Sequence, residues 1–270
     1  MVLIFDGLNL MHRAKIALGQ DSKWGVVFAT IRSIRSLIHK KKPDEVYFVL
    51  EGKPKRRIEQ SEGTYKAGRA ESADTFWAQC TDVVQLMKDY FPIKIVRHLD
   101  YEADDVIAYL ATEISKHSEV EIVSTDTDFI QLLTTSNPNI KLYSPIKDVY
   151  VEPHPVDYVT WKALRGDKTD NIQGIPGIGD KRAQKMIEEN KLHTLTEEQA
   201  QIFEHNKSMI RFESIENLSN LDIQYCTKRK NDELRQLLRE KYDFQSMTSD
   251  KSWFNWIGSF NKPWMCLLNK

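Results

Sequence analysis

The sequence predicts an α/β fold with a mostly parallel central sheet flanked by helices. The main observation is that short, apolar, β-prone runs alternate with amphipathic segments of helical period. A second observation is that strand patterns end near residue 151, after which the chain is almost entirely helical in pattern. We therefore expect an α/β core over residues 1–155 and a helical lobe over residues 156–270.

The predicted elements follow from the spacing of apolar residues. Trp24 to Lys40 is the clearest helix, since its apolar residues recur at every third or fourth position along one stripe. The turn residues Ser144 and Pro145 lie between two β-prone runs and favour a hairpin. The other predicted strands are 2–5, 46–50, 93–96 and 120–124, the predicted hairpin strands are 140–143 and 149–151, and the other predicted helices are 75–90 and 104–115.

Composition limits the class of protein. The hydrophobic fraction of 41% and the charged fraction of 29% are ordinary for a globular protein. No apolar run approaches the roughly 20 residues that a membrane span requires. The opening run stops at Asp6 without a basic leader, so it indicates a strand and not a signal peptide. The three cysteines form no CxxC pair and predict buried thiols in a reducing compartment, the cytoplasm.

Acidic residues follow each of the predicted strands of the sheet. Ligands of open α/β sheets bind outside the carboxyl ends of the strands, so these carboxylates are expected to meet at one edge. Glu102 and Asp104 converge only if Glu102 lies just before its helix begins. The acids are Asp6, Glu51, Glu102, Asp104, Asp105, Asp126 and Asp128, with Asp167 and Asp170 coming from the later helical part.

So many carboxylates at one edge require cations. Two like charges about 4 Å apart cost roughly 4 kcal/mol at an effective dielectric near 20. The ligands are all oxygens without a nearby His or Cys set, which selects Mg²⁺, with Mn²⁺ as a substitute, over zinc. Two such ions hydrolyse phosphodiesters in known enzymes. Asp6 or Asp128 taken alone is equally well explained as a loop end or a helix cap, and for Asp105 the cap stays open.

The sequence resembles the 5′-nucleases, also called flap endonucleases, over roughly residues 1–190. It is most similar to phage 5′-exonucleases and phage ribonuclease H. Each short motif is moderately specific, and their shared order is highly specific. The motifs are Ile4-Phe5-Asp6-Gly7 with Asn9-Leu10 and Arg13, Tyr65-Lys66 with Arg69, Tyr101-Glu102-Ala103-Asp104-Asp105, Ser124-Thr125-Asp126-Thr127-Asp128-Phe129, and Gly166-Asp167-Lys168-Thr169-Asp170-Asn171 running into 174–179.

The resemblance implies a 5′-nuclease with two metal clusters. The first cluster would use Asp6, Glu51, Glu102 and Asp104. The second would use Asp126, Asp128, Asp167 and Asp170, with Asp104 near both and Asp105 less directly involved. The family usually has Asp at the position of Glu51, whose extra methylene would move the first metal or require a bridging water.

The resemblance also implies two regions that bind nucleic acid. Residues 52–72 would form an arch over the active site, where Lys66 and Arg69 act on the scissile phosphate, Tyr65 stacks on a base and Arg57 adds a cation. The glycine-rich stretch 174–179 would be a helix–turn–helix-type element. Its Gly174, Gly177 and Gly179, with Lys181 and Arg182, would approach duplex phosphates, with a K⁺ ion possible there.

Three rival functions remain open on the sequence. An aspartyl phosphatase requires a second acid at position 8, where Leu8 stands. A junction-binding protein without catalysis would gain nothing from such charge repulsion. A single-strand ribonuclease of the related PIN type would lack the element at 170–179.

The expected substrates are duplex DNA with a 5′ flap or overhang and RNA–DNA hybrids. The expected protein is a monomer that removes primers in replication and repair beside other replication proteins, in a bacterial or phage-infected cell, with no role at a membrane. Trp253, Trp256 and Trp264 are interpreted as core packing.

Overall fold

A seven-stranded mixed sheet forms the centre of the molecule, in the order β6-β5-β4-β1-β2-β3-β9. The computed structural model describes residues 1–18, 22–60 and 73–268. The inner strands pair in parallel, and the edge strands β6 and β9 pair antiparallel to their neighbours. The strands are β1 (Val2–Asp6), β2 (Glu45–Leu50), β3 (Lys94–His98), β4 (Val120–Val123), β5 (Ile140–Ser144), β6 (Val149–Tyr150) and β9 (Leu221–Gln224), and a separate ribbon is formed by β7 (Gly166–Asp167) and β8 (Ile172–Gln173).

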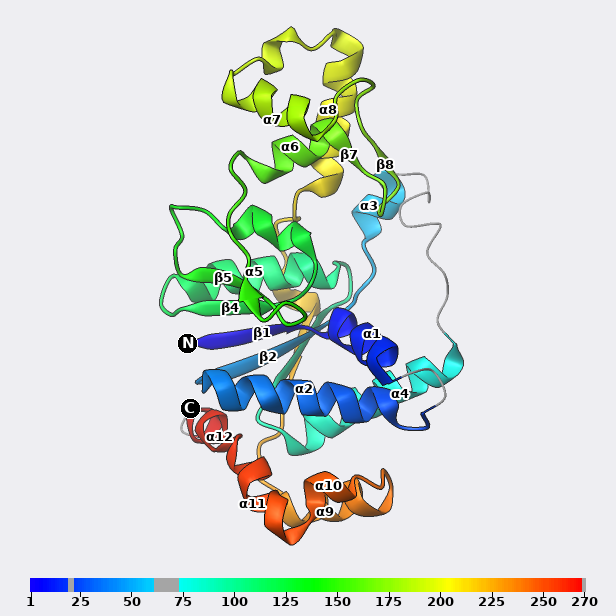
Figure 1. Ribbon diagram of the computed structural model, residues 1–270, viewed down its shortest axis with the longest axis vertical. Helices are drawn as coiled ribbons and strands as arrows, with labels where there is room; N and C mark the ends of the chain where they lie inside the picture. Colours follow the sequence, from blue (N-terminus) through cyan, green and yellow to red (C-terminus); the bar gives the residue numbers. More distant parts are fainter. Residues whose placement is uncertain (19–21, 61–72, 269–270) are drawn as a thin grey trace.

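Helices cover both faces of the sheet and extend from it at two ends (Figure 1). The helices are α1 (Gly7–Leu18), α2 (Gly25–Lys41), α3 (Lys55–Gln60), α4 (Asp74–Tyr90), α5 (Ala103–Ser115), α6 (Tyr158–Arg165), α7 (Asp180–Glu188), α8 (Glu197–Ile210), α9 (Asn231–Glu240), α10 (Gln245–Thr248), α11 (Asp250–Gly258) and α12 (Asn261–Leu268). Short 3₁₀ turns occupy Thr127–Leu132, Leu192–Thr194 and Leu218–Asn220.

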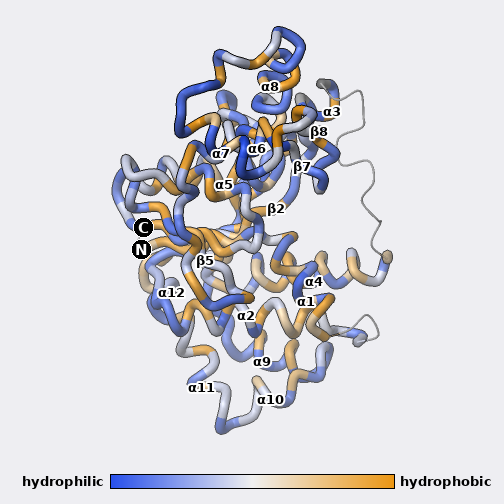
Figure 2. The backbone as a smooth tube through the Cα atoms, turned by 45° about the horizontal axis from the view of Figure 1, so that its top comes forward, coloured by the Kyte–Doolittle hydropathy of each residue, from blue (hydrophilic) through white to orange (hydrophobic). Residues whose placement is uncertain are grey.

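The alternation of side chains along β1 separates the two main cores. Leu3 and Phe5 belong to the cluster that includes α1, α2 and α4. Val2 and Ile4 belong to the cluster that includes α5. A strand with both faces buried reads as a continuous apolar run, which is why β1 is recognisable from sequence. Figure 2 shows these hydrophobic segments concentrated around the sheet.

The parallel sheet and the helices predicted from apolar spacing are confirmed. Several elements differ from the expectation, among them the ribbon of β7 and β8, which was not predicted. α1 was not predicted, although it begins directly after β1, because its first turn carries no acidic residue and its first residue is Gly7. α3 occupies part of the stretch 52–72 that was expected to be an arch or loop. β9 was missed because its burial alternates only weakly along an exposed edge.

The chain after residue 210 returns to the α/β core. β9 adds an edge strand to the sheet, and most aromatic residues of the last helices are buried in the same cluster as α2 and α4. Trp253, Trp256 and Trp264 are all buried there, as expected of core residues. The division into units 1–155 and 156–270 stays a prediction. The described packing separates residues 158–210, which have their own small core, from the rest.

Removal of a buried C-terminal aromatic ring should destabilise the whole protein. Phe260 is fully buried between α11 and α12, where its ring contacts the rings of Phe91 and Trp256. We expect Phe260→Ala to lower the free energy of unfolding by about 3–5 kcal/mol. Phe254→Ala is the control, because Phe254 lies on α11 with 81% of its surface exposed. Equal urea midpoints for the two variants would show that these helices are not part of the core.

The small core over residues 158–210 places the loop between β7 and β8. α6, α7 and α8 pack together, and Asn206 of α8 donates hydrogen bonds to the carbonyls of Ala163 and Gln173. Gly166 ends α6 with φ +81°, where a Cβ atom would lie 2.2 Å from the backbone nitrogen of Gly174. Glycine at this position therefore allows the chain to turn directly into Asp167.

Within the described residues, none of the helices combines the length and the apolar character that crossing a membrane requires.

Candidate metal and nucleic-acid site

A cavity of about 610 Å³ opens at the carboxyl ends of the central strands. Five of the predicted acids line it together with Asn9, His12 and Arg13. They come from four neighbouring strand ends, as the parallel topology requires. The acids are Asp6 from β1, Glu51 from β2, Glu102 and Asp104 from the connection between β3 and α5, and Asp126 from the end of β4.

Hydrogen bonds connect the ends of β1 and β4 beneath this cavity. Asp6 is only 6% exposed, and its carboxylate accepts from the hydroxyl of Ser124 at 2.8 Å and from the backbone N–H of Asn9 at 3.2 Å. The same Ser124 oxygen accepts from the backbone N–H of Asp126 at 3.0 Å. The side chain of Asn9 in turn bonds Thr125. Asp6 is thus fixed in position before any ligand binds.

Glu102 stands directly before α5, as convergence with Asp104 requires. It is the N-cap residue in extended conformation, and it forms a capping box with Asp105. Both Glu102 and Asp104 therefore reach the same cavity from one helix N-terminus. The free N–H groups at that terminus favour the negative charges.

Arg57 occupies a position different from the predicted phosphate contact. It is 3% exposed, and its guanidinium makes ion pairs with Glu102, Asp105 and, at 3.8 Å, Glu213. A buried guanidinium with these partners cannot reach a phosphate. Arg57 therefore neutralises carboxylates behind the cavity and ties α3 to α5.

Asp105 also faces away from the cavity. It is fully buried, accepts two bonds from the guanidinium of Arg57, and accepts the backbone N–H of Glu213 at 2.8 Å. Burial raises the pKa of the Asp105 carboxyl, against the opposing effect of Arg57. Asp105 thus caps the helix α5 and pairs with Arg57, and the cap is the alternative that the sequence left open.

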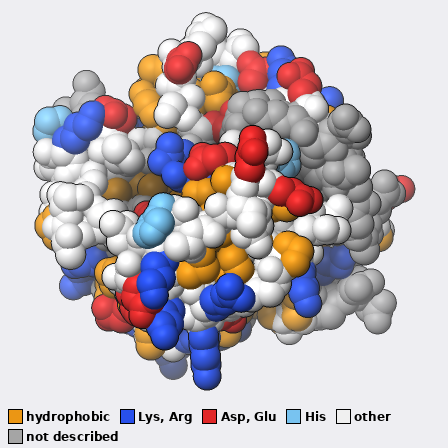
Figure 3. Space-filling view, turned by 90° about the horizontal axis from the view of Figure 1, so that it is seen from above, with side chains coloured by type: hydrophobic (Ala, Val, Ile, Leu, Met, Phe, Trp, Pro, Cys, Tyr) orange, Lys and Arg blue, Asp and Glu red, His pale blue; other side chains and the backbone are white. Residues whose placement is uncertain are grey.

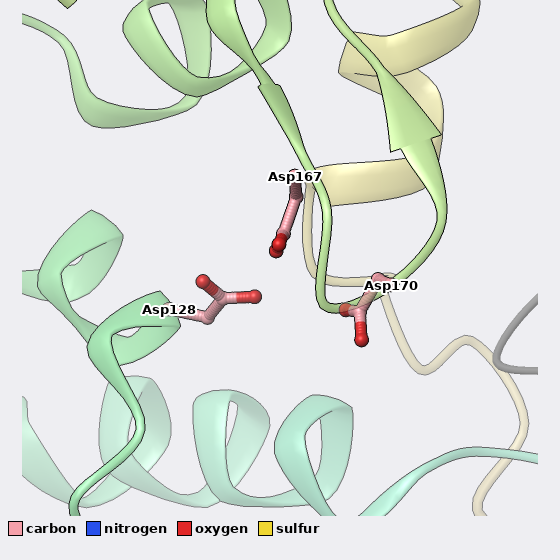
Figure 4. Close-up of side chains that lie close together, drawn as sticks. All are labelled: Asp128, Asp167 and Asp170. Carbon is pink, nitrogen blue, oxygen red and sulfur yellow. The ribbon is translucent and has the colours of Figure 1, made fainter. Parts of the chain in front are cut away.

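A second group of acids lies beside the first, across the loop between β7 and β8. Oxygens of Asp128, Asp167 and Asp170 all lie within 4.8 Å of one another. Figure 4 shows the carboxylates of Asp128 and Asp167 directed toward each other, with Asp170 on the loop that follows. Among the residues described, this is the one group of His, Cys, Asp or Glu with spacing suited to a metal ion.

Asp126 connects the two groups of acids. It was expected in the second cluster, but its side chain lines the cavity of the first. Its Oδ1 accepts the backbone N–H of Asp128 at 2.8 Å and so caps the 3₁₀ turn Thr127–Leu132. The cap holds the Asp128 side chain toward Asp167 while Asp126 itself faces the cavity.

Lys162 belongs to this site and was not predicted from the sequence. Its side chain is only 4% exposed, and its ammonium forms ion pairs with Asp128 and, at 2.6 Å, with Asp167. Burial works to lower the pKa of Lys162, but the carboxylates raise it above its ordinary value. The available signal was its place on an amphipathic helix five residues before Asp167.

The carboxyls that share Lys162 differ in their pKa values. Burial raises the pKa of Asp128, with Lys162 acting against it. Burial also acts to raise the pKa of Asp167, but bonds from Lys162 and from the N–H of Thr169 leave that pKa below its ordinary value. Tyr158, whose hydroxyl lies 3.3 Å from Asp128, has its pKa raised by burial to about 12 and stays a neutral donor.

Close backbone packing fixes the chain after Glu51. A Cβ atom on Gly52 would lie 2.0 Å from the carbonyl oxygen of His98 and 2.3 Å from that of Tyr101. Glycine is therefore required where the strand end of β2 passes the connection to α5. This contact sets the position of Glu51 relative to Glu102.

The predicted nucleic-acid residues fall into three places. Tyr65, Lys66 and Arg69 lie outside the described residues. Arg13 lines the acidic cavity from α1. The glycine-rich stretch leads into α7, where Lys181 and Arg182 are exposed in the first turn and Arg182 donates to the carbonyl of Gly177 at 3.2 Å.

The backbone conformation and packing explain why two positions of this stretch are glycine. Gly177 has φ +79°, and a Cβ atom on Gly174 would lie 2.1 Å from the carbonyl oxygen of Arg165. Gly179 is the N-cap residue of α7 and has nothing near its Cβ position, so the backbone there is open to a large ligand. Figure 3, which looks onto this end of the molecule, shows Lys and Arg side chains gathered along its lower edge and acids nearer the centre.

The residues present fit divalent cations of the hard class. The acidic donors are carboxylate oxygens, and they come from strand ends, the N-terminus of α5, a 3₁₀ turn and the β7–β8 loop. Lys162 supplies one positive charge between Asp128 and Asp167, and Arg57 pairs with Glu102 and Asp105. Binding of divalent cations would further offset the repulsion among the carboxylates.

Comparison with known families matches almost the whole chain. Residues 1–159 match the model described as the 5′-3′ exonuclease, N-terminal resolvase-like domain. Residues 153–248 match the model described as the 5′-3′ exonuclease, C-terminal SAM fold. The two matches meet where the sheet gives way to the helices α6–α8.

Curated relatives agree with this match. The chain is 32% identical over 249 residues to a DNA polymerase I of Caldicellulosiruptor bescii, covering 84% of this chain and 28% of that protein. It is 33% identical over 195 residues to a 5′-3′ exonuclease of Aquifex aeolicus, covering 67% of this chain and 66% of that protein. The chain thus spans just over a quarter of the polymerase and about two thirds of the exonuclease.

Solved structures share the fold. The T5 D15 protein crystallised with metal ions superposes with a TM-score of 0.65 at 25% identity, covering 77% of this chain and 88% of that one. Flap endonuclease-1 of Methanococcus jannaschii superposes with a TM-score of 0.62 at 14% identity, covering 99% and 93%. The second likeness concerns the fold alone. Together with the two domain matches, these results show that the chain belongs to the 5′-3′ exonuclease family.

Proposed function

We propose that this protein is a structure-specific 5′-nuclease that hydrolyses phosphodiester bonds at 5′ flaps and 5′ ends of DNA or RNA–DNA duplexes. The observation that carries the proposal is the meeting of Asp6, Glu51, Glu102, Asp104 and Asp126 in one cavity beside the trio of Asp128, Asp167 and Asp170. Support comes from a relative named 5′-3′ exonuclease and from a T5 D15 protein described as a flap endonuclease.

Two Mg²⁺ ions, replaceable by Mn²⁺, are the proposed cofactors. Asp6, Glu51, Glu102 and Asp104 would hold one ion, and Asp128, Asp167 and Asp170 the other, with Asp126 between them. When bound, such ions lower the pKa of water and stabilise charge on the phosphate. Solved T5 proteins with bound metal ions, zinc in one of them, support a site for divalent metal ions. In the reaction, water attacks phosphorus, the bond to O3′ breaks, and a 3′-hydroxyl and a 5′-phosphate result.

The chain's own residues position and neutralise the acids. The hydroxyl of Ser124 orients Asp6, and the helix N-terminus of α5 orients Glu102 and Asp104. Lys162 holds Asp128 and Asp167 near each other in spite of their like charges. With its carboxylate partners, Lys162 remains protonated through the neutral range. Its ammonium therefore acts as a fixed positive charge and not as a base.

Nucleic acid would be held on both sides of the acids. Lys181, Arg182 and the backbone around Gly179 are proposed to contact duplex phosphates without reading sequence, with K⁺ possible at Gly174–Gly179. Lys66 and Arg69 remain predicted contacts of the scissile phosphate. A T5 flap endonuclease structure in complex with DNA and metal ions supports a DNA substrate. The proposed use is primer and flap removal in replication and repair by a monomer.

The proposal is tested with a duplex that carries a labelled 5′ flap. With Mg²⁺ we expect release of short 5′ fragments, and with EDTA we expect binding without cleavage. A single-stranded RNA of the flap sequence is the control for a PIN-type ribonuclease, and it should remain intact. Binding of the flap without cleavage in either Mg²⁺ or Mn²⁺ would reject the nuclease and favour a junction-binding protein.

A further inference from the structure

The trio of Asp128, Asp167 and Asp170 is assembled from two separately packed parts of the chain. Asp128 lies on the 3₁₀ turn that follows β4, and the next residue, Phe129, is buried in the core that includes α5. Asp167 and Asp170 lie on β7 and the loop after it, beside the small core of residues 158–210. Figure 4 shows Asp128 and Asp167 approaching each other from separate ribbons. The spacing of the trio therefore depends on how these two parts are held together.

We infer that Gln131 is a positioning residue that fixes Asp128 relative to the other two aspartates of the trio. This inference rests on the proposed function, which it deepens by adding a residue that acts on the second group of acids. Gln131 lies three positions after Asp128 on the same 3₁₀ turn, so the two side chains stand on one side of it. The side-chain Nε2 of Gln131 donates to the backbone carbonyl of Asp128 at 3.0 Å.

The same side-chain amide reaches the point where the chain leaves the small core. Its Nε2 also donates to the carbonyl of Ile210 at 3.4 Å, and its Oε1 accepts the backbone N–H of Phe212 at 3.2 Å. Ile210 is buried in the small core, whereas the ring of Phe212 lies against that of Phe129, with ring centroids 5.6 Å apart. Gln131 therefore ties its own turn to the segment in which the chain passes from one core to the other.

Neighbouring contacts hold this passing segment in place. The carbonyl of Arg211 accepts from the guanidinium of Arg57 at 3.1 Å, and the backbone N–H of Glu213 donates to Asp105 at 2.8 Å. Arg57 and Asp105 are both buried. Side chains of the α/β core thus bond successive backbone groups from residue 210 to residue 213. Gln131 extends this set of bonds to the turn that carries the first aspartate of the trio.

The bond from Gln131 is compatible with a bound cation. Lys162 and Tyr158 also contact Asp128, but they bond its carboxylate, which is the group that a cation would bind. Gln131 bonds the backbone carbonyl and occupies neither carboxylate oxygen. A glutamine suits this place because its amide both donates to carbonyls and accepts an N–H. Groups that orient the ligands of a metal ion typically change its affinity by about 10- to 100-fold.

The test uses Gln131→Met, which keeps the length of the side chain and removes its amide. Binding of Mn²⁺ without nucleic acid is followed by electron paramagnetic resonance of the free ion, and the trio is identified as the site that Asp128→Asn weakens. We expect Gln131→Met to weaken Mn²⁺ binding at this site by about 10-fold. The single-turnover rate of flap cleavage at saturating substrate should fall by about 10-fold or more, while the Kd for the flap in EDTA stays within about twofold.

A double-mutant cycle with Asp128→Asn separates positioning from a general loss of structure. If Gln131 acts through Asp128, adding Gln131→Met to Asp128→Asn should change the Mn²⁺ affinity and the rate little further. A merely structural loss would be equally large in both backgrounds. Gln236→Met is the matched control, because Gln236 is exposed on α9, where it bonds Glu240 of the same helix, and this variant should behave as the native protein.

A second variant covers poor folding of the first. Gln131→Asn keeps a polar amide but is one methylene group too short to hold Ile210 and Phe212 together with the turn. It should show the same losses of Mn²⁺ affinity and rate, with a urea midpoint nearer to that of the native protein.

The inference is overturned if Gln131→Met leaves the Mn²⁺ affinity and the rate unchanged, or if its losses are as large in the Asp128→Asn background as in the native one. A raised Kd with an unchanged rate would also reject positioning and would assign Gln131 to substrate binding. Cleavage by the native protein in Mg²⁺ checks the proposed function separately. If the native protein does not cleave, the nuclease fails, and the Mn²⁺ affinities alone decide the role of Gln131.

Discussion

Asp128→Asn should lower the single-turnover rate of flap cleavage by about 10³-fold, equivalent to about 4 kcal/mol of barrier. The variant removes one anionic oxygen from the trio of Asp128, Asp167 and Asp170. It leaves Lys162 with a single ionised partner, so the buried ammonium would draw Asp167 more strongly toward itself. The position offered to a divalent cation is thereby both less charged and displaced.

The Asp128→Asn substitution should change the affinity for DNA much less than the rate of cleavage. Asp128 contributes a negative charge, and its loss should leave the Kd for the flap within about threefold of the native value, or tighten it. Asp232→Asn is the matched control, because Asp232 is exposed in the first turn of α9, outside the acidic cavity and the trio. A rate for Asp128→Asn within tenfold of the native rate would remove Asp128 from the site.

Arg57→Ala should destabilise the protein by about 3–5 kcal/mol, as expected when one partner of a buried ion pair is removed. Glu102 and Asp105, both buried, would face each other without their shared guanidinium. Their repulsion would also displace Glu102 from the cavity. The rate of cleavage at saturating substrate should therefore fall. The measurements are urea unfolding and the cleavage rate as a function of Mg²⁺ concentration.

Lys55→Ala provides the control within the same helix α3. Lys55 is exposed and pairs with Asp100 at the surface, so its loss should have little effect on stability. Arg57→Lys should recover only part of the stability, because an ammonium cannot make the paired bonds that Asp105 receives. If Arg57→Ala instead weakened DNA binding and left stability unchanged, the original expectation of a phosphate contact would be correct.

The sequence was most informative where one residue type recurs at strand ends. Parallel pairing places successive carboxyl ends on one edge, so Asp6, Glu51 and Asp126 could be placed at that edge from their positions alone. The sequence did not predict that Asp126 lines the first cavity. The position of Glu102 directly before its helix was the one that convergence with Asp104 requires. These predictions needed only local patterns and one topological rule.

The charges that neutralise the acids could not be predicted in the same way. Arg57 meets Asp105 across 48 residues of chain, and Lys162 meets Asp128 across 34. A basic residue in a charged stretch reads as exposed, and only tertiary packing shows which one is buried. The same reason explains the missed strand β9, whose pairing with β3 joins residues more than 120 positions apart.

The proposed reaction depends most on divalent cations that bind at this edge of the sheet. Fe²⁺ in place of Mg²⁺, with ascorbate and peroxide, generates hydroxyl radicals that cut the backbone next to the bound ion. Mass spectrometry of the fragments should locate cuts near residues 6, 102–104, 126–128 and 167–170, suppressed by excess Mg²⁺. In Asp128→Asn the cuts near 167–170 should be weakened. Cuts elsewhere, or cuts that Mg²⁺ does not suppress, would contradict a metal site at the strand ends.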